Sequence, residues 1–239
     1  MRIEIWSDVV CPWCYIGKRR LETALAGFAH RDEVELVYRS FQLDPAAPQV
    51  PTETVVESLG RKYGGGPAAG QQMVDRVEAV AAEEGLVFRL AQAQHVGTVD
   101  AHRLLHLALE QDAATQVALK EELLAAYFVR AENVADHDVL RAAAATVGLD
   151  AARVDEVLAS DAYADAVEAD IRQAAAYGAT GVPFFVVDRR YAVSGAQPTE
   201  VFSRLLDRAW SEAHPPVQLV GGAVGGTAGD ACGIDGSAC

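Results

Sequence analysis

Four cysteines form two close pairs at opposite ends of the 239-residue chain. Cys11 and Cys14 are separated by two residues, and Cys232 and Cys239 lie near the last residue. Four cysteines are too few for a disulfide-dense scaffold. Two chemistries use cysteines in close pairs. In thiol–disulfide exchange, one thiolate attacks a disulfide and the second thiol resolves the mixed disulfide, whereas in a structural zinc site each pair supplies half of the ligands.

The position of the first pair favours redox chemistry. Cys11 follows a stretch with strand character at 2–7, and Pro12 opens a helical pattern, so we expect Cys11 at the N-cap and Pro12 at the first helical position. The free N–H groups of Trp13 and Cys14, together with the helix dipole, would then favour a thiolate at Cys11. Cys14 follows on the same helix face and is expected to be the less exposed of the two.

Zinc binding is the alternative for the same residues, because C-x2-C is also half of a common zinc site. Such half-sites generally lie in loops or ribbons, not at a strand-to-helix junction. The second pair, Cys232 and Cys239, is separated by six residues, which is outside the usual zinc spacing. We therefore predict a redox pair at Cys11 and Cys14 and no metal site.

Periodicity predicts the elements that carry the first pair. Residues 2–7 and 33–40 alternate between apolar and polar side chains, and the segment between them has the spacing of an amphipathic helix. A strand, a helix and a second strand within forty residues predict a βαβ unit with parallel strands.

A long helical stretch follows, and strands then return. Its start, with Pro45, Pro48 and Pro51, is expected to be loop-like, and Gly64-Gly65-Gly66-Pro67 is expected to break the chain again. Helices are expected at 68–85, 98–111, 114–130 and 136–147, with one or two more within 150–177. A hairpin at 182–193 and a helix at 198–212 complete the pattern. The predicted organisation is a sheet domain in two halves (1–44 and 179–213), an inserted helical domain (45–178) and a flexible Gly-rich tail (214–239).

Four stretches then point to a known family. They are Ser7-Asp8-Val9-Val10-Cys11-Pro12-Trp13-Cys14-Tyr15-Ile16-Gly17, Phe41-Gln42-Leu43-Asp44-Pro45, Ala101-His102-Arg103-Leu104 and Gly181-Val182-Pro183. With the helical insertion, residues 2–212 resemble the DsbA family of thiol–disulfide oxidoreductases, in its FrnE-like branch. Relatives of that branch include 2-hydroxychromene-2-carboxylate isomerases and kappa-class glutathione transferases. The resemblance implies an α/β, thioredoxin-like fold with an inserted all-helical domain.

The resemblance also implies roles for single residues. Cys11 would be the nucleophile, Cys14 the resolving thiol, and Pro183 a cis-proline that presents the backbone of Val182 to a substrate. Pro12 and Trp13 would tune the pair, and His102 would line a cleft between the domains. The related isomerases and transferases typically carry serine where this chain has Cys11, so two thiols favour redox exchange. FrnE-like proteins also resemble this chain in a second pair near the C-terminus, which makes Cys232 and Cys239 candidates for an auxiliary redox pair.

Composition limits the partners. Twenty Lys and Arg against 34 Asp and Glu give a net charge of −14, which argues against binding nucleic acid or an anionic membrane with the whole surface. No targeting segment and no apolar run long enough to span a membrane are recognised, so a cytoplasmic location is expected. Persistent structural disulfides are disfavoured there, which again favours a reactive pair.

The sequence therefore predicts a cytoplasmic enzyme that exchanges disulfides with protein or small-molecule thiols through a redox-active disulfide and without another cofactor. Glutathione or thioredoxin is expected as its recycling partner. A glutathione-dependent isomerase or transferase is the alternative enzyme, and a zinc-stabilised binding protein is the alternative without catalysis. The direction of exchange depends on the reduction potential of the pair, which the residues alone do not set.

Overall fold

The central strand of the sheet leads directly to the first cysteine pair. In the computed structural model, which describes residues 1–216, β1 (Arg2–Ser7) lies between β2 (Glu35–Ser40) and β3 (Phe184–Val187), and β4 (Tyr191–Ser194) forms the far edge. β1 pairs parallel with β2 and antiparallel with β3, so Ile5 lies opposite both Tyr38 and Phe185. The predicted parallel βαβ unit and the predicted hairpin are both confirmed.

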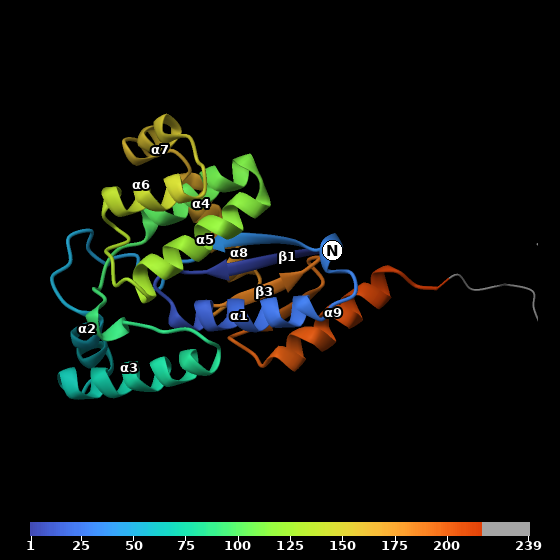
Figure 1. The fold of residues 1–239 in the computed structure, drawn as a ribbon, viewed down its shortest axis with the longest axis horizontal. Coiled ribbons are helices and arrows are strands. Elements are labelled where there is room, and N and C mark those ends of the chain that lie inside the picture. The colour runs from blue at the N-terminus through green and yellow to red at the C-terminus, as the bar shows by residue number, and fades with distance from the viewer. Residues whose placement is uncertain (217–239) are drawn as a thin grey trace, which may run out of the picture.

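Two helices cover one face of this sheet. They are α1 (Pro12–Ala26), which connects β1 to β2, and α9 (Thr199–Ala213), which follows the hairpin. Both lie below the sheet in Figure 1. Apolar side chains of these helices and of the strands, including Ile3, Ile5, Leu21, Phe202 and Leu206, form one buried cluster. Its burial fixes the axis of α1 against the sheet, and with it the position of the turn at the start of α1.

Seven helices are inserted between β2 and β3. They are α2 (Val55–Tyr63), α3 (Gly66–Glu83), α4 (Val99–Gln111), α5 (Ala113–Phe128), α6 (His137–Thr146), α7 (Ala151–Leu158) and α8 (Ala164–Ala176), with a short 3-10 turn at Leu90–Gln92. A second 3-10 turn, Arg31–Glu33, lies between α1 and β2. The predicted thioredoxin-like α/β fold with a helical insertion is confirmed. The segment expected as one or two helices within 150–177 is two, α7 and α8.

The insertion covers the second face of the sheet. α5 and α8 lie against β2, on the opposite side of the sheet from α1 and α9 (Figure 1). Trp6 on β1 donates a hydrogen bond from Nε1 to the carbonyl oxygen of Asp170 on α8 at 2.7 Å, and its ring meets that of Tyr177 edge-on at 5.5 Å. The inserted helices therefore complete the layers around β1 and reach the residues that precede Cys11.

The sequence analysis missed one helix of the insertion. The loop around Pro45, Pro48 and Pro51 and the break at Gly64 are present as expected, but α2 lies between them. Thr54 caps this helix and accepts a hydrogen bond from the backbone of Glu57, whose side chain accepts one from the backbone N–H of Thr54 in return. This capping box stabilises the start of a short helix despite the prolines before it and the glycines after it.

None of the helices within residues 1–216 is long and apolar enough to cross a membrane. Cys232, Cys239 and most of the predicted tail lie outside the described residues.

Candidate active site

The turn between β1 and α1 holds the first cysteine pair as the sequence predicts. Cys11 is the N-cap residue of α1, with extended backbone angles, and Pro12 is its first helical residue. Trp13 is 40% exposed on the outer surface of the turn. The expected difference in exposure between the two thiols is wrong, because Cys11 and Cys14 are both 3% exposed. The β1–α1 loop and the chain opposite it cover Cys11 as deeply as the helix covers Cys14.

The segment opposite Cys11 is the one that precedes β3. The Val182–Pro183 peptide bond is cis, and the sulfur of Cys11 lies 3.6 Å from the carbonyl oxygen of Val182. Gly17 on α1 allows this segment to approach, since a Cβ atom there would lie 3.0 Å from Cγ of Pro183. The structure therefore brings Cys11, Cys14, Val182 and Pro183 together from the two ends of the folded chain.

The two thiols affect each other's ionisation. A hydrogen bond with Cys14, and then burial, raise the pKa of Cys11 well above its ordinary value, although the backbone N–H of Cys14 acts in the opposite direction. Burial also raises the pKa of Cys14, but the hydrogen bond from Cys11 and the charge of Lys120 outweigh it and lower that pKa. The helix start alone therefore does not determine the pKa of Cys11, because the neighbouring thiol and burial act on it as well.

The charge beside Cys14 comes from the inserted helices. Lys120 on α5 is fully buried, and its Nζ donates to the carbonyl oxygen of Ser7 at 3.5 Å. The hydroxyl of Ser7 also acts to lower the pKa of Cys14. It is one of two buried polar side-chain atoms without a hydrogen-bond partner within residues 1–216. Neither Ser7 nor Lys120 was predicted as a site residue.

Asp8 anchors the loop that leads to Cys11. Its carboxylate accepts hydrogen bonds from the backbone N–H groups of Val9 and Leu43, both at 2.8 Å, and contacts Nε2 of His102 at 3.2 Å. Burial raises the pKa of Asp8, but the hydrogen bond and charge of His102, with Leu43 and Lys120, lower it overall. Burial lowers the pKa of His102 despite the neighbouring carboxylate, so the imidazole is neutral near pH 7.

His102 was expected to line a cleft, and this expectation is wrong. The residue is fully buried, and its side chain contacts Asp8 from beneath the β1–α1 loop. The helix that carries His102, α4, packs against α5 and α8, so the imidazole faces the interior. Asp8, the hydrogen-bond partner of His102, is the residue of the two that lines a cavity.

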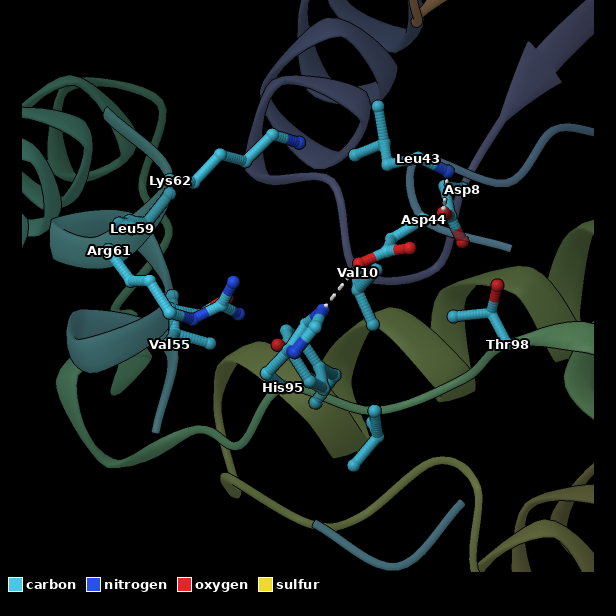
Figure 2. Close-up of a pocket in the computed structure, with 13 residues that line it drawn as sticks. Asp8, Val10, Leu43, Asp44, Val55, Leu59, Arg61, Lys62, His95 and Thr98 are labelled. Atoms are coloured by element: carbon cyan, nitrogen blue, oxygen red, sulfur yellow. Dashed lines mark hydrogen bonds and ion pairs between the residues drawn. The ribbon is translucent and has the colours of Figure 1, made fainter. Parts of the chain in front are cut away.

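A cavity of about 410 Å³ opens beside the same loop. Asp8, Val10 and Leu43 form one wall, and Arg61 and Lys62 on α2 project toward it from the opposite side (Figure 2). Apolar and polar side chains line the space between them, including Val55, Leu59, His95, Val96, Thr98 and Tyr127. Nε2 of His95 contacts Asp44 at 3.0 Å and Nδ1 contacts Glu53 at 3.2 Å, which ties the loop after β2 to the start of the insertion.

Within residues 1–216, no three His, Cys, Asp or Glu side chains gather as metal ligands would. Cys232 and Cys239 are not among those residues.

Comparisons with known proteins agree with this geometry. The family model of the DSBA-like thioredoxin domain matches residues 2–207. The crystal structure of the probable DsbA oxidoreductase SCO1869 from Streptomyces coelicolor is 48% identical, with a TM-score of 0.83 over 99% of this chain and 97% of that one. The uncharacterized protein YwbO of Bacillus subtilis (strain 168) is 25% identical over 209 residues, which is 86% of this chain and 96% of YwbO.

More distant structures share the fold. The cytosolic disulfide reductase DsbM from Pseudomonas aeruginosa, in a structure with GSH, is 17% identical and has a TM-score of 0.62 over 88% of this chain and 99% of its own. A 2-hydroxychromene-2-carboxylate isomerase is 15% identical and has a TM-score of 0.64 over 89% of this chain and 98% of its own. At these identities the likeness concerns the fold alone.

Proposed function

This chain belongs to the DSBA-like thioredoxin domain family, and from that premise we propose that it exchanges disulfides with thiol substrates through Cys11 and Cys14. The observation that carries the proposal is the placement of Cys11. Its sulfur lies at the start of α1 and 3.6 Å from the carbonyl oxygen of Val182, and Cys14 follows three residues later in α1. The 48% identity to a probable DsbA oxidoreductase supports the same reaction class.

The geometry supports two successive displacements. When Cys11 transfers its proton to Cys14, the Cys11 thiolate attacks one sulfur of a substrate disulfide. A mixed disulfide forms, and the other substrate sulfur leaves as a thiolate that takes up a proton. Cys14 then loses its proton and attacks the sulfur of Cys11, which releases the second substrate thiolate and leaves a Cys11–Cys14 disulfide. Two electrons pass from the protein to the substrate, and the reverse sequence oxidises a dithiol.

The surroundings of Cys11 support a broad class of partners. Trp13 is exposed beside it, and the cavity at Val10 has room for part of a peptide or a small thiol. We propose protein or small-molecule thiols and disulfides as substrates, a cytoplasmic location, and glutathione or thioredoxin for recycling. The structure of cytosolic DsbM with GSH is a precedent within the fold for the location and for a small thiol partner.

The test is reduction of insulin disulfides coupled to dithiothreitol. We expect Cys11→Ser to lose the catalysed rate, because serine cannot form the mixed disulfide. The matched control is the double variant Cys232→Ser/Cys239→Ser, which keeps the Cys11–Cys14 pair and should keep at least part of the rate. Full activity of Cys11→Ser would reject the proposal.

The same variant separates the two alternatives. A glutathione-dependent isomerase or transferase would retain its activity in Cys11→Ser and bind glutathione tightly. A zinc-stabilised binding protein would contain bound metal and fewer than four free thiols after reduction. Four reactive thiols without zinc exclude the second alternative.

We also propose that Cys232 and Cys239 act as an auxiliary pair that exchanges with Cys11 and Cys14. The proposal rests on their sequence spacing and on the glycines around them. Truncation at Gly222 removes both thiols and should reduce turnover or oxidant resistance. Unchanged values of both would reject this role.

A further inference from the structure

An exposed lysine faces the cavity beside the β1–α1 loop. The chain has three lysines, and Lys62 is the exposed one, because Lys18 is 4% exposed and Lys120 is fully buried. Lys62 forms no ion pair or side-chain hydrogen bond within the described residues, and its Nζ lies 5.8 Å from the ring centroid of Tyr63. Figure 2 shows its side chain extended from α2 toward the loop that carries Leu43. The ammonium group is therefore free to bind an anion that enters the cavity.

The other charged groups that line the cavity already have partners. Arg61 forms an ion pair with Glu53, in which Nε lies 3.2 Å from Oε2. Asp44 contacts His95 at 3.0 Å. Asp8 accepts two backbone hydrogen bonds, both at 2.8 Å. The lysine is therefore the charged group of the lining that remains available for a ligand, and a carboxylate is the group that an ammonium binds best in proteins.

The cavity begins next to the attacking cysteine. Val10, which immediately precedes Cys11, forms part of its wall, whereas Cys11, Val182 and Pro183 do not line it. A substrate joined to Cys11 therefore enters the cavity where its chain continues past Val10. An extended peptide advances about 3.3 Å per residue, so the residues that flank its cysteine can extend into this space. The volume of about 410 Å³ lies within the range of about 300–1,000 Å³ that is usual for ligand pockets.

The lining suits a side chain with an apolar stem and an anionic tip. Val55 and Leu59 on α2, together with Val96 and Tyr127, supply apolar surface next to the lysine. Glutamate has this shape, with methylene groups before its carboxylate. The net charge of −14 repels acidic partners at a distance, but exposed charges act mainly within one Debye length, about 8 Å at physiological salt. Selection at Lys62 is therefore local and concerns the residues close to the reacting cysteine.

The helices of the insertion hold the lysine in place relative to the active-site turn. A Cβ atom at Gly70 on α3 would overlap the backbone of Val56 on α2, so the two helices pack backbone to backbone. Glu84, the C-cap residue of α3, accepts a hydrogen bond from Nε of Arg20 on α1 at 2.6 Å. The helix that begins after Cys11 is thus linked through α3 to the helix that carries Lys62.

We propose that this cavity selects protein substrates that carry an acidic residue near the reacting cysteine, and that Lys62 binds the carboxylate of that residue. The inference rests on the disulfide exchange proposed above and adds a substrate class to it. The apolar lining packs against the stem of the acidic side chain, and the ammonium group binds its tip. Such a charge pair contributes to the choice and orientation of the partner more than to affinity.

The first experiment compares peptides that differ in one residue. Each peptide has a single cysteine joined to nitrothiobenzoate and carries either glutamate or glutamine at the same position near that cysteine. The Cys11 thiolate attacks the peptide sulfur, the protein–peptide disulfide forms, and nitrothiobenzoate, the better leaving group, departs with the electron pair and is measured by its colour. Every protein variant carries Cys14→Ser, Cys232→Ser and Cys239→Ser, so that the new disulfide persists.

The measured quantity is the ratio of the two reaction rates. We expect the glutamate peptide to react about three- to fivefold faster at low salt, which is the effect that a single exposed ion pair supports. Lys62→Gln should bring the ratio to about one, and Lys62→Glu should favour a peptide with lysine at the same position. Arg76→Gln removes an exposed positive charge from α3, outside the lining, and should keep the ratio. Equal ratios with and without Lys62 would overturn the proposal.

The second experiment observes the lysine directly. Reductive methylation with ¹³C-formaldehyde labels Lys62 and keeps its positive charge, and the NMR signal is identified by its loss in Lys62→Gln. In the completed disulfide between Cys11 and the peptide, we expect this signal to shift with the glutamate peptide relative to the glutamine peptide. The same signal with both peptides would overturn the proposal. A shift caused by free glutathione but not by the glutamate peptide would assign the cavity to a small thiol and would also overturn it.

These comparisons are separate from the test of the proposed function, because neither of them measures turnover. A protein that reduces insulin but shows equal rates with the two peptides would keep the proposed function and lose this inference. A preference for the glutamate peptide that depends on Lys62, in a protein that does not reduce insulin, would support the binding site and count against the proposed function.

Discussion

The two sulfurs of the turn are equally buried, but they face different parts of the chain. The outer side of the site consists of Cys11, Val182, Pro183 and Gly17, and the inner side consists of Cys14, Ser7, Asp8, His102 and Lys120. The outer side is built by the segments of the sheet and offers a neutral carbonyl group. The inner side depends on α4 and α5 of the insertion and is charged. Under the function proposed above, the outer side would contact the substrate and the inner side would control the charge of the pair.

Replacing Cys14 should have the largest effect on turnover, because it removes the resolving thiol of the inner side and leaves Cys11, the attacking thiol of the outer side. In Cys14→Ser we expect insulin reduction to fall by about 100-fold or more, while Cys11 still forms a mixed disulfide that persists. The measurement pairs the turnover rate with intact mass after incubation with a peptide disulfide. Turnover close to the wild-type rate would mean that Cys14 does not resolve the intermediate.

The next effect concerns Asp8, the charged anchor of the inner side. Asp8→Asn keeps the size of the side chain but removes one of the two acceptor oxygens that hold Val9, Leu43 and His102. We expect the free energy of unfolding to fall by about 2–4 kcal/mol in urea denaturation at pH 7. Asp44→Asn, on the surface of the same cavity, is the control and should cost much less. Equal losses of unfolding free energy in the two variants would show that the hydrogen bonds of Asp8 stabilise the fold no more than those of Asp44.

The inner side also predicts a pH dependence of stability. The pKa of His102 is lower in the folded protein than its ordinary 6.5, so the unfolded chain binds more protons below pH 6.5. Stability should therefore fall as the pH decreases from 6.5 through the folded pKa. Asp8, whose folded pKa is also lowered from 3.8, adds a further loss only below that value.

The check is urea denaturation at pH 8 and pH 5. In His102→Gln the difference in the free energy of unfolding between the two pH values should shrink, because the substitution removes the imidazole that takes up a proton on unfolding. An unchanged difference would mean that His102 is not the group that titrates.

The smallest predicted effect tests the packing of the outer side. In Gly17→Ala the new methyl group would lie 3.0 Å from Cγ of Pro183 and 3.3 Å from Cζ of Phe185, so the chain near Val182 must shift. We expect a loss of about 1 kcal/mol in stability and a several-fold fall in turnover. Gly27→Ala, where the closest contact is 3.7 Å, is the matched control on the same helix segment. Similar effects of both substitutions would argue against a tight contact at Pro183.

The sequence predicted the outer side well because its signals are local. A strand, an N-cap cysteine and a proline at the first helical position are adjacent in the chain, and the structure has each of them. The βαβ unit and the hairpin also follow from short-range alternation. The one missed helix, α2, had a local signal as well, since Thr54 and Glu57 have the spacing of a capping box.

The inner side could not be predicted in the same way, because it depends on contacts between distant segments. Lys120 lies 106 positions beyond Cys14 in the sequence, and a lysine on a helix is usually exposed. Its only signal was its place on the buried face of α5, four residues after Gln116 and four before Leu124. The lowered pKa of Cys14 depends on the neighbouring Cys11 and then on Lys120, and the position of the helix alone does not show the contribution of Lys120.

The most direct test of disulfide exchange is a redox titration of the pair in glutathione buffers, with Cys232 and Cys239 replaced by serine. Samples are quenched in acid, alkylated, digested and analysed by mass spectrometry across the range of glutathione to glutathione disulfide ratios. We predict a disulfide between Cys11 and Cys14 that forms and breaks reversibly as the ratio changes. If both cysteines remained separate thiols or separate glutathione adducts at every ratio, the proposed mechanism would be contradicted.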